Sequence, residues 1–253
     1  MPHRKTDETT HVRTNGNFKL AMTAADPSVG LPYGSIPRLL LAWLTTEAVR
    51  TGSRELNLGN SLSSFLRELD LAPSGGKRGY MPRVKNQLNR LLGSLVRCSH
   101  SAQGEDSFIQ FLIADRADLW WDTKTPDQQG LWESSVLLGS SFYDEVTANA
   151  IPIDTRALRA LRQSPMALDV YVWLTHRYSY LKKPTVIPWQ SLEGQFGADY
   201  TRTRDFKQKF LHHLRAVHAV YGEARFALDP HGLELLPSPT HVRRVRGPTK
   251  PPR

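Results

Sequence analysis

The stretch TRTRDFKQKFLHHL, residues 201–214, decides how the second half of this chain is interpreted. At 100° per residue its bulky apolar side chains, Phe206, Phe210 and Leu214, fall on one side of a helix, and Val217 and Tyr221 continue that stripe. The opposite side carries groups that can bind bases or phosphates: Arg204, Gln208, Lys209, His212 and Arg215. We therefore predict a helix with one buried face and one cationic face.

A second helix with the same division is predicted from about Met81 to Arg97. Six Lys or Arg and no Asp or Glu occur between Lys77 and Cys98. The apolar side chains gather on one side: Met81, Val84, Leu88, Leu91, Leu92 and Leu95. The residues assigned to the cationic side, or to the turn before it, are Lys77, Arg78, Arg83, Lys85, Asn86, Gln87, Arg90 and Arg97.

Both cationic faces lack the mixture of signs that a solvated helix usually carries to form Glu–Lys pairs. Arg forks onto guanine, Asn and Gln onto adenine, and Lys neutralises phosphate. Two basic solvated faces are the plainer alternative. We interpret the helices as recognition helices for two major grooves of DNA. The contacts predicted from flanking residues and from the basic C-terminal tail are Thr201, Arg202, Arg243 and Arg244.

Composition restricts the class of partner. The 253 residues carry a net charge of +9 and are 40% hydrophobic, so the chain can bury a core and its partner should be an anion. The richest apolar run, residues 39–44, is far shorter than the roughly 18 residues that span a bilayer. No apolar signal segment follows Met1. Cys98 is the single cysteine, which excludes an internal disulfide and fits the cytoplasm.

The order of predicted elements indicates two similar units. Residues 31–120 and 134–236 each read as three helices followed by a β-hairpin, with Asp154 and Ser164 as helix caps in the second. That order is typical of a winged helix, so we predict an α+β fold of two tandem winged-helix domains. Residues 121–133 are predicted to be a linker, residues 1–30 a disordered arm and residues 237–253 a disordered basic tail.

Signatures of catalysis are incomplete. Tyr180 lies three residues before Lys183, but the His-x-His pair that would hold a metal beside a nuclease tyrosine is missing. The GGK at 75–77 lacks the other residues of a phosphate-binding loop. His212 and His213 are adjacent, so on a helix they point about 100° apart and share a metal poorly. We expect no enzymatic activity, no metal and no cofactor.

Several of these segments resemble the plasmid-encoded RepA replication initiator family. The most specific are SPMALDVYVWLTHR at 164–177 and WQSLEGQFG at 189–197, within a C-terminal region that continues through FKQKFLHHLRAVHAVYGEARFAL at 206–228. GSIPRLLLAWLTTEAVR at 34–50, NLGNSLSSFLRELDL at 57–71 and GGKRGYMPRVKNQL at 75–88 resemble the N-terminal half of the family. The resemblance covers roughly residues 30–240.

The resemblance implies a tandem winged-helix protein of the bacterial cytoplasm that binds repeated sites in double-stranded plasmid origin DNA. It also implies origin opening and recruitment of the host initiator and replicative helicase. Related initiators often bind repeats as monomers and repress their own promoter as dimers, so the resemblance implies that a homodimer can form through the N-terminal winged helix. The ELNL strand at 55–58 and the hairpin of that winged helix could pair across the interface, although no sequence feature demands it.

Two further classes of function stay open. A transcriptional repressor would use the same two winged helices without opening an origin, and composition does not separate it from an initiator. An RNA-binding or membrane-surface module would expose aromatic side chains among the cations. Here Phe206, Phe210 and Tyr221 fall on the predicted buried stripe instead.

Overall fold

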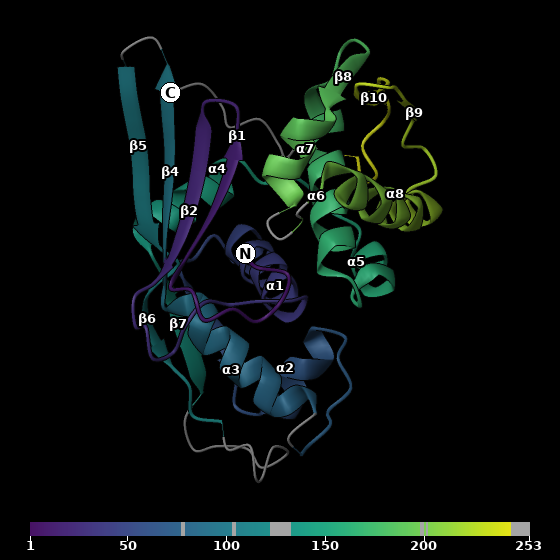
Figure 1. The fold of residues 1–253 in the computed structure, drawn as a ribbon. Helices are drawn as coiled ribbons and strands as arrows, with labels where there is room; N and C mark the ends of the chain where they lie inside the picture. The colour runs from purple at the N-terminus through teal and green to yellow at the C-terminus, as the bar shows by residue number, and fades with distance from the viewer. Residues whose placement is uncertain (77–78, 103–104, 122–132, 198–199, 201, 244–253) are drawn as a thin grey trace, which may run out of the picture.

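The computed structural model describes residues 1–76, 79–102, 105–121, 133–197, 200 and 202–243, and its fold is mixed α+β (Figure 1). The N-terminal unit contains α1 (Ile36–Thr51), β3 (Glu55–Gly59), α2 (Leu62–Glu68) and α3 (Tyr80–Leu92), followed by β4 (Ser94–Ala102) and β5 (Glu105–Leu112). The apolar sides of α1, α2 and α3 supply much of its core, including Leu40, Leu44, Phe65, Val84 and Leu88, each fully buried.

The C-terminal unit follows the predicted order of elements. It contains α5 (Thr155–Leu161), α6 (Pro165–Tyr180), β8 (Thr185–Pro188), α7 (Trp189–Phe196), α8 (Thr203–Val220), β9 (Phe226–Leu228) and β10 (Gly232–Leu235). The three strands pair antiparallel in the order β8-β10-β9. Asp154 accepts a hydrogen bond from Arg156 N at 2.8 Å, and Ser164 Oγ accepts one from Ala167 N at 3.1 Å, so both predicted caps are confirmed.

The predicted buried stripe of α8 is also confirmed. Phe206, Phe210, Val217 and Tyr221 are fully buried, and Leu214 is 1% exposed. The stripe packs on α6 and α7 through ring contacts: Tyr221 with Tyr171 and Tyr178, and Phe210 with Trp189 and Phe196. Since this face is committed to the core, the opposite face of α8 must lie at the surface.

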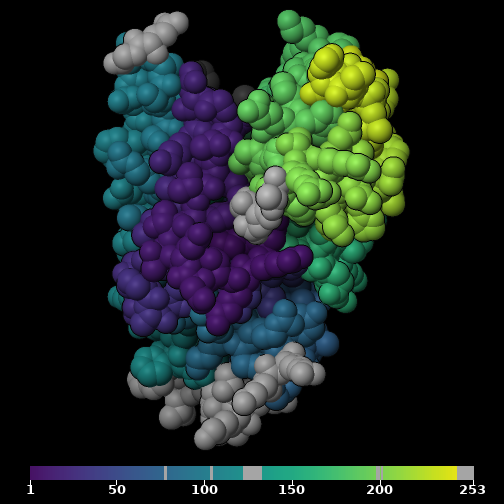
Figure 2. All heavy atoms as spheres, viewed as in Figure 1, coloured from purple at the N-terminus to yellow at the C-terminus, as the bar shows by residue number. Residues whose placement is uncertain are grey.

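The N-terminal residues do not form the predicted disordered arm. Instead β1 (Thr10–Asn15) and β2 (Phe18–Ala24) form a hairpin, and β2 pairs with β4, which gives the sheet order β1-β2-β4-β5. The turn is Gly16–Asn17, with Gly16 at φ 57°, a conformation that glycine adopts without strain. Figure 2 shows this segment, in purple, between the β4–β5 hairpin and the C-terminal unit.

The boundary between the units also differs from the prediction. Trp121, assigned to the linker, is 4% exposed and stacks on Phe65 with ring centroids 4.9 Å apart. β7 (Ser134–Leu138) pairs with β3 and with β6 (Ala114–Asp118), and α4 (Ser140–Ala148) packs on α1 and β5. The N-terminal unit therefore extends to about residue 148, because these long-range strand pairings leave no local signal. Residues 122–132 of the predicted linker lie outside the described residues.

The start of the predicted tail is folded as well. Tyr221 Oη donates to Pro239 O at 2.5 Å, and the His241 ring stacks on the Tyr221 ring with centroids 4.6 Å apart. Tyr171 Oη and His241 Nδ1 lie 2.9 Å apart. Residues 237–243 therefore close the core of the C-terminal unit, while residues 244–253 lie outside the described residues.

The buried face of α8 can be tested with two leucines. Leu214→Ala removes a side chain that is 1% exposed and should lower the free energy of unfolding by about 2–5 kcal/mol. Leu228→Ala, at a position that is 58% exposed, is the matched control and should change it by less than about 1 kcal/mol. Urea unfolding followed by circular dichroism measures both. A change below about 1 kcal/mol in Leu214→Ala would mean that Leu214 is outside the core and that α8 is rotated about its axis.

A buried histidine in β1 should make stability depend on pH. Burial, reinforced by nearby positive charges that include Arg13, lowers the pKa of His11 from 6.5 to about 3. Below pH 6.5 the unfolded chain therefore binds a proton that the folded chain does not, so acidification destabilises the fold.

We expect this group alone to cost about 2 kcal/mol of unfolding free energy between pH 7 and pH 5. His11→Leu should flatten that part of the pH profile in denaturant titrations. His231→Leu, at an exposed turn, is the control. An unchanged profile in His11→Leu would show that His11 is protonated in the folded chain.

Candidate nucleic-acid interface

The exposed face of α8 presents a row of polar and cationic side chains that the rest of the protein does not bind. Those of Arg202, Arg204, Gln208, Lys209, His212 and Arg215 are all exposed. Within the described part of the chain, none of the six makes a hydrogen bond or ion pair. From Arg204 to Arg215 the row spans about 16 Å at 1.5 Å per residue. An α-helix of this kind fits the major groove of B-DNA, which is about 12 Å wide.

The packing of α7 against α8 fixes the direction of this row. A Cβ on Gly197, at the end of α7, would lie 2.7 Å from Cδ2 of Phe206, so a larger residue there would push the two helices apart. At the start of α8, Thr203 Oγ1 donates to Glu193 Oε2 of α7 at 2.7 Å. These contacts between α7 and α8 thus hold the cationic face outward.

The corresponding helix of the N-terminal unit, α3, presents fewer free groups. Arg83 and Asn86 are exposed, and the Arg83 guanidinium lies over the Tyr80 ring, 5.4 Å from its centroid. Both residues line a cavity of about 360 Å³, which is bounded on the other side by Tyr33, Gly34 and Ser35 at the start of α1.

Three other predicted contacts on α3 hold the fold together. Gln87 is 4% exposed and its Oε1 accepts from Tyr33 N at 2.8 Å, so its assignment to the outer face was wrong. Lys85 Nζ donates to Trp121 O at 2.6 Å. Arg90 Nη1 donates to Leu31 O at 3.1 Å, and its Nε donates to Asn86 Oδ1 at 2.9 Å. These side chains tie α3 to chain segments that lie more than 30 residues away in sequence.

The remaining predicted contacts are scattered. α3 ends at Leu92 and not at Arg97, because Gly93 ends the helix and β4 begins at Ser94. Arg97 is therefore on a strand, where its guanidinium lies 3.7 Å from the centroid of the exposed Phe108 ring. Arg243 is exposed near the end of the described chain. Lys77, Arg78, Thr201 and Arg244 lie outside the described residues.

Groups that resemble catalytic pairs have structural partners here. Ser164 Oγ lies 3.1 Å from His213 Nδ1, but the same oxygen caps α6. Burial, with a contribution from His212, lowers the pKa of His213. Tyr180 Oη accepts from Arg177 Nη1 at 2.7 Å. In the described residues no three His, Cys, Asp or Glu side chains are placed to hold a metal ion, and no helix is both long and apolar enough to cross a membrane.

Comparison with known families identifies the family to which the chain belongs. The family model described as "Plasmid encoded RepA protein" matches residues 31–191, which is more than half of the chain. The chain belongs to the plasmid-encoded RepA replication initiator family. The match runs from just before α1 through β8 and ends inside α7, so β1, β2 and α8 lie outside it. No curated protein matches the chain.

Two solved structures of RctB domains 2 and 3 resemble this RepA family member in fold. A selenomethionine derivative aligns with a TM-score of 0.58 at 10% identity and covers 96% of this chain and 95% of that chain. RctB-155-483 aligns with a TM-score of 0.53 at 11% identity and covers 85% of this chain and 79% of that chain. At these identities the likeness concerns the arrangement of helices and strands, and it extends over both units.

The buried amide on α3 provides a test of these assignments. Gln87→Ala leaves Tyr33 N without its acceptor and should lower the free energy of unfolding by about 1–3 kcal/mol. Asn89→Ala, at an exposed position of the same helix, is the control and should change it by about 0.5 kcal/mol or less. Thermal unfolding of the two variants measures both effects. A destabilised Asn89→Ala with an unaffected Gln87→Ala would reverse the two faces of α3.

Proposed function

We propose that this chain initiates plasmid replication by binding repeated sites in double-stranded origin DNA, with α8 as the helix that reads base sequence. The observation that carries the proposal is the row of exposed, unpartnered side chains from Arg204 to Arg215. Membership of the RepA family supports the initiator role. The order α6, β8, α7, α8, β9, β10, with β8 paired to β10, supports a winged helix in which α8 is the third helix.

The chemistry of the row suits a major groove. Arg204 and Arg215 can fork onto guanine, Gln208 can bond adenine at two atoms, and Lys209 can neutralise a phosphate. His212 adds a donor or acceptor between the two arginines. Because these groups have no protein partners to give up, binding DNA requires no internal contact to break.

The N-terminal unit has a smaller part in this proposal. Of the predicted contacts on α3, Arg83 and Asn86 are exposed, while Lys85, Gln87 and Arg90 bond to other parts of the fold. We propose that the N-terminal unit is a second winged helix that contacts an adjacent groove chiefly through phosphates. A single chain would then occupy about 20 base pairs, two turns of the duplex.

The proposed function needs no catalytic step. Origin opening would draw on the free energy of DNA binding, and the partners would be the host initiator and replicative helicase, in the bacterial cytoplasm. No metal or cofactor enters the proposal.

One observation favours a repressor as the second candidate. β5 lies at the edge of its sheet among the described strands and exposes Phe108, Ile109 and Leu112. A second copy of the chain could pair along this edge and give a homodimer that binds a palindromic operator. The predicted ELNL strand, now β3, is also an edge strand among the described residues, but its Leu56 and Leu58 are buried, so β5, in the other predicted interface element, is the better candidate.

Replication itself separates the two candidates. A plasmid that carries only this gene and its upstream repeats should replicate in a suitable host. A plasmid that fails to replicate while the protein still silences its own promoter would leave the repressor.

Charge removal on α8 tests the DNA interface directly. Arg204→Ala and Arg215→Ala should each weaken specific binding by about 1–3 kcal/mol in fluorescence anisotropy, with little change in melting temperature. Log affinity should fall with log salt by about 0.9 per phosphate contacted. Arg50→Ala, which removes an exposed arginine from α1, is the control and should bind like the wild type. Unchanged affinity in both α8 variants would remove α8 from the interface.

A further inference from the structure

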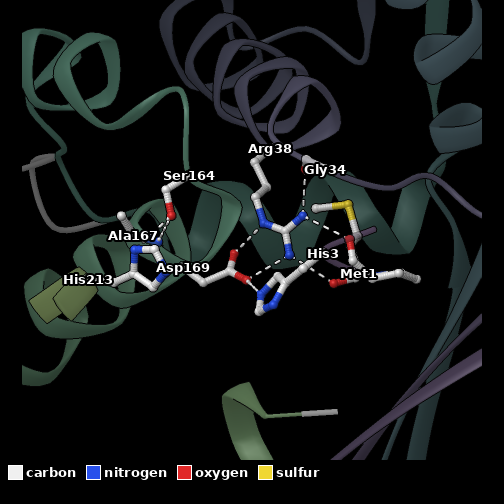
Figure 3. Close-up of polar contacts among 9 residues, drawn as sticks. Met1, His3, Gly34, Arg38, Ser164, Ala167, Asp169 and His213 are labelled. Carbon is white, nitrogen blue, oxygen red and sulfur yellow. Dashed lines mark hydrogen bonds and ion pairs between the residues drawn. The ribbon is translucent and has the colours of Figure 1, made fainter. Parts of the chain in front are cut away.

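An ion pair between a buried arginine and a half-buried aspartate joins the two units. Arg38 of α1 is 8% exposed, and it donates to Asp169 of α6 through Nε at 2.6 Å and Nη2 at 2.7 Å (Figure 3). Its remaining donors bond to backbone carbonyls of Gly34, Pro2 and Met1. All five guanidinium N–H groups therefore have acceptors, and two of the acceptors belong to the C-terminal unit.

Asp169 is held from two sides. His3 Nε2 lies 3.0 Å from Asp169 Oδ2, so the N-terminal segment reaches the same carboxylate as Arg38. Partial burial favours the neutral acid, but the charge of Arg38 and the hydrogen bonds from His3 and Arg38 outweigh it and lower the pKa of Asp169. The carboxylate is therefore ionised throughout the neutral range, and the contact is a true ion pair.

Each partner sits on the helix that supports a DNA-facing helix. α6 packs against α8 through Tyr171 and Tyr178, whose rings contact Tyr221. α1 packs against α3, which carries Arg83. The Arg38–Asp169 pair thus connects the two supports, while neither residue is part of the exposed cationic faces.

Two contacts further out limit rotation about this pair. Asp70, between α2 and α3, forms ion pairs with Arg159 of α5 and with Arg162 just after α5. Its backbone adopts φ 56°, which is uncommon for a residue other than glycine. The second contact is the close packing of α7 on β1, where a Cβ added to Gly194 would lie only 3.0 Å from Thr14 O. The Asp70 contact is exposed and therefore weak, whereas the Arg38 contact is buried.

We propose that Arg38 and Asp169 are positioning residues that fix the orientation of α8 relative to the N-terminal unit, and so determine the spacing of DNA contacts that one chain can make. The inference rests on the proposed function. Along the chain only the short segment 149–154 connects α4 to α5. Without the pair, the exposed Asp70 contact and the packing of α7 on β1 remain between the units, and they restrict reorientation less than the pair does. With the pair intact, the chain binds tightly at one spacing between its two contact sites on DNA. Without the pair, it binds at several spacings with similar affinity.

The test compares affinities for two duplexes. The first carries the site that the protein protects in a footprint, and the second has five base pairs, about half a turn, inserted between the two protected patches. The wild type should bind the second duplex about tenfold or more weaker. In Asp169→Asn and Arg38→Gln the ratio of the two affinities should fall to within about threefold. This ratio does not depend on the fraction of protein that is folded.

Arg50→Ala is the matched control, because it removes another ion-paired arginine of α1 that does not bridge the units. It should keep the wild-type ratio. A wild type that tolerates the insertion, or variants that keep its ratio, would overturn the inference. If Arg204→Ala bound DNA as tightly as the wild type, that result would count against the proposed function. The failure of the inference and the failure of the proposed function are therefore distinct.

A measurement without DNA gives a second readout. Spin labels on Val49→Cys of α1 and Ala219→Cys of α8, both exposed positions, report the distance between the units in a Cys98→Ser background. Pulsed electron resonance should give one narrow distance distribution for the otherwise native chain. Asp169→Asn should broaden or shift this distance distribution. A distribution with unchanged width and mean distance would refute the positioning role.

Discussion

The guanidinium of Arg38 is the group on which the arrangement of the whole chain depends. A charge that leaves water costs several kcal/mol unless hydrogen bonds and an opposite charge replace the water, and here every donor of the guanidinium is used. Its acceptors come from the N-terminal segment, from the turn before α1 and from α6. Separating the units would therefore strand a buried cation, so the pair specifies a geometry even where it adds little net stability.

Within the C-terminal unit, local sequence predicted the order of elements from α5 to β10, but not the start of the unit or the packing of residues 237–243 on its core. The spacing of Phe206, Phe210 and Leu214 determines which side of α8 is buried. Ser164 caps α6 by a hydrogen bond to a residue only three positions further along the chain. The hairpin of β1 and β2 was missed although its signal is local. Gly16–Asn17 between two stretches that alternate in polarity is a hairpin turn sequence, and the polarity of residues 1–30 concealed it.

Long-range contacts explain the errors in the N-terminal unit. Periodicity can place a residue on one side of a helix, but it does not reveal which distant segment will cover that side. Gln87 lies on the border of the predicted face and is buried by Tyr33, and Lys85 reaches Trp121. The excess of cations on α3 is therefore partly structural, since Arg90 and Lys85 neutralise carbonyl dipoles at chain segments that a neutral side chain would leave unsatisfied.

The two cationic helices consequently differ in kind. On α8 Lys207 lies over the Trp189 ring, but among the described residues Arg204, Lys209 and Arg215 have no hydrogen-bond or ion-pair partner. These three can therefore change without loss of the fold. On α3 most of the cations belong to the fold, and changing them would alter both stability and surface. If α8 reads DNA as we propose, sequence variation that changes its specificity can accumulate on the outer face of α8, while α3 and the Arg38 contact preserve the frame that positions this helix.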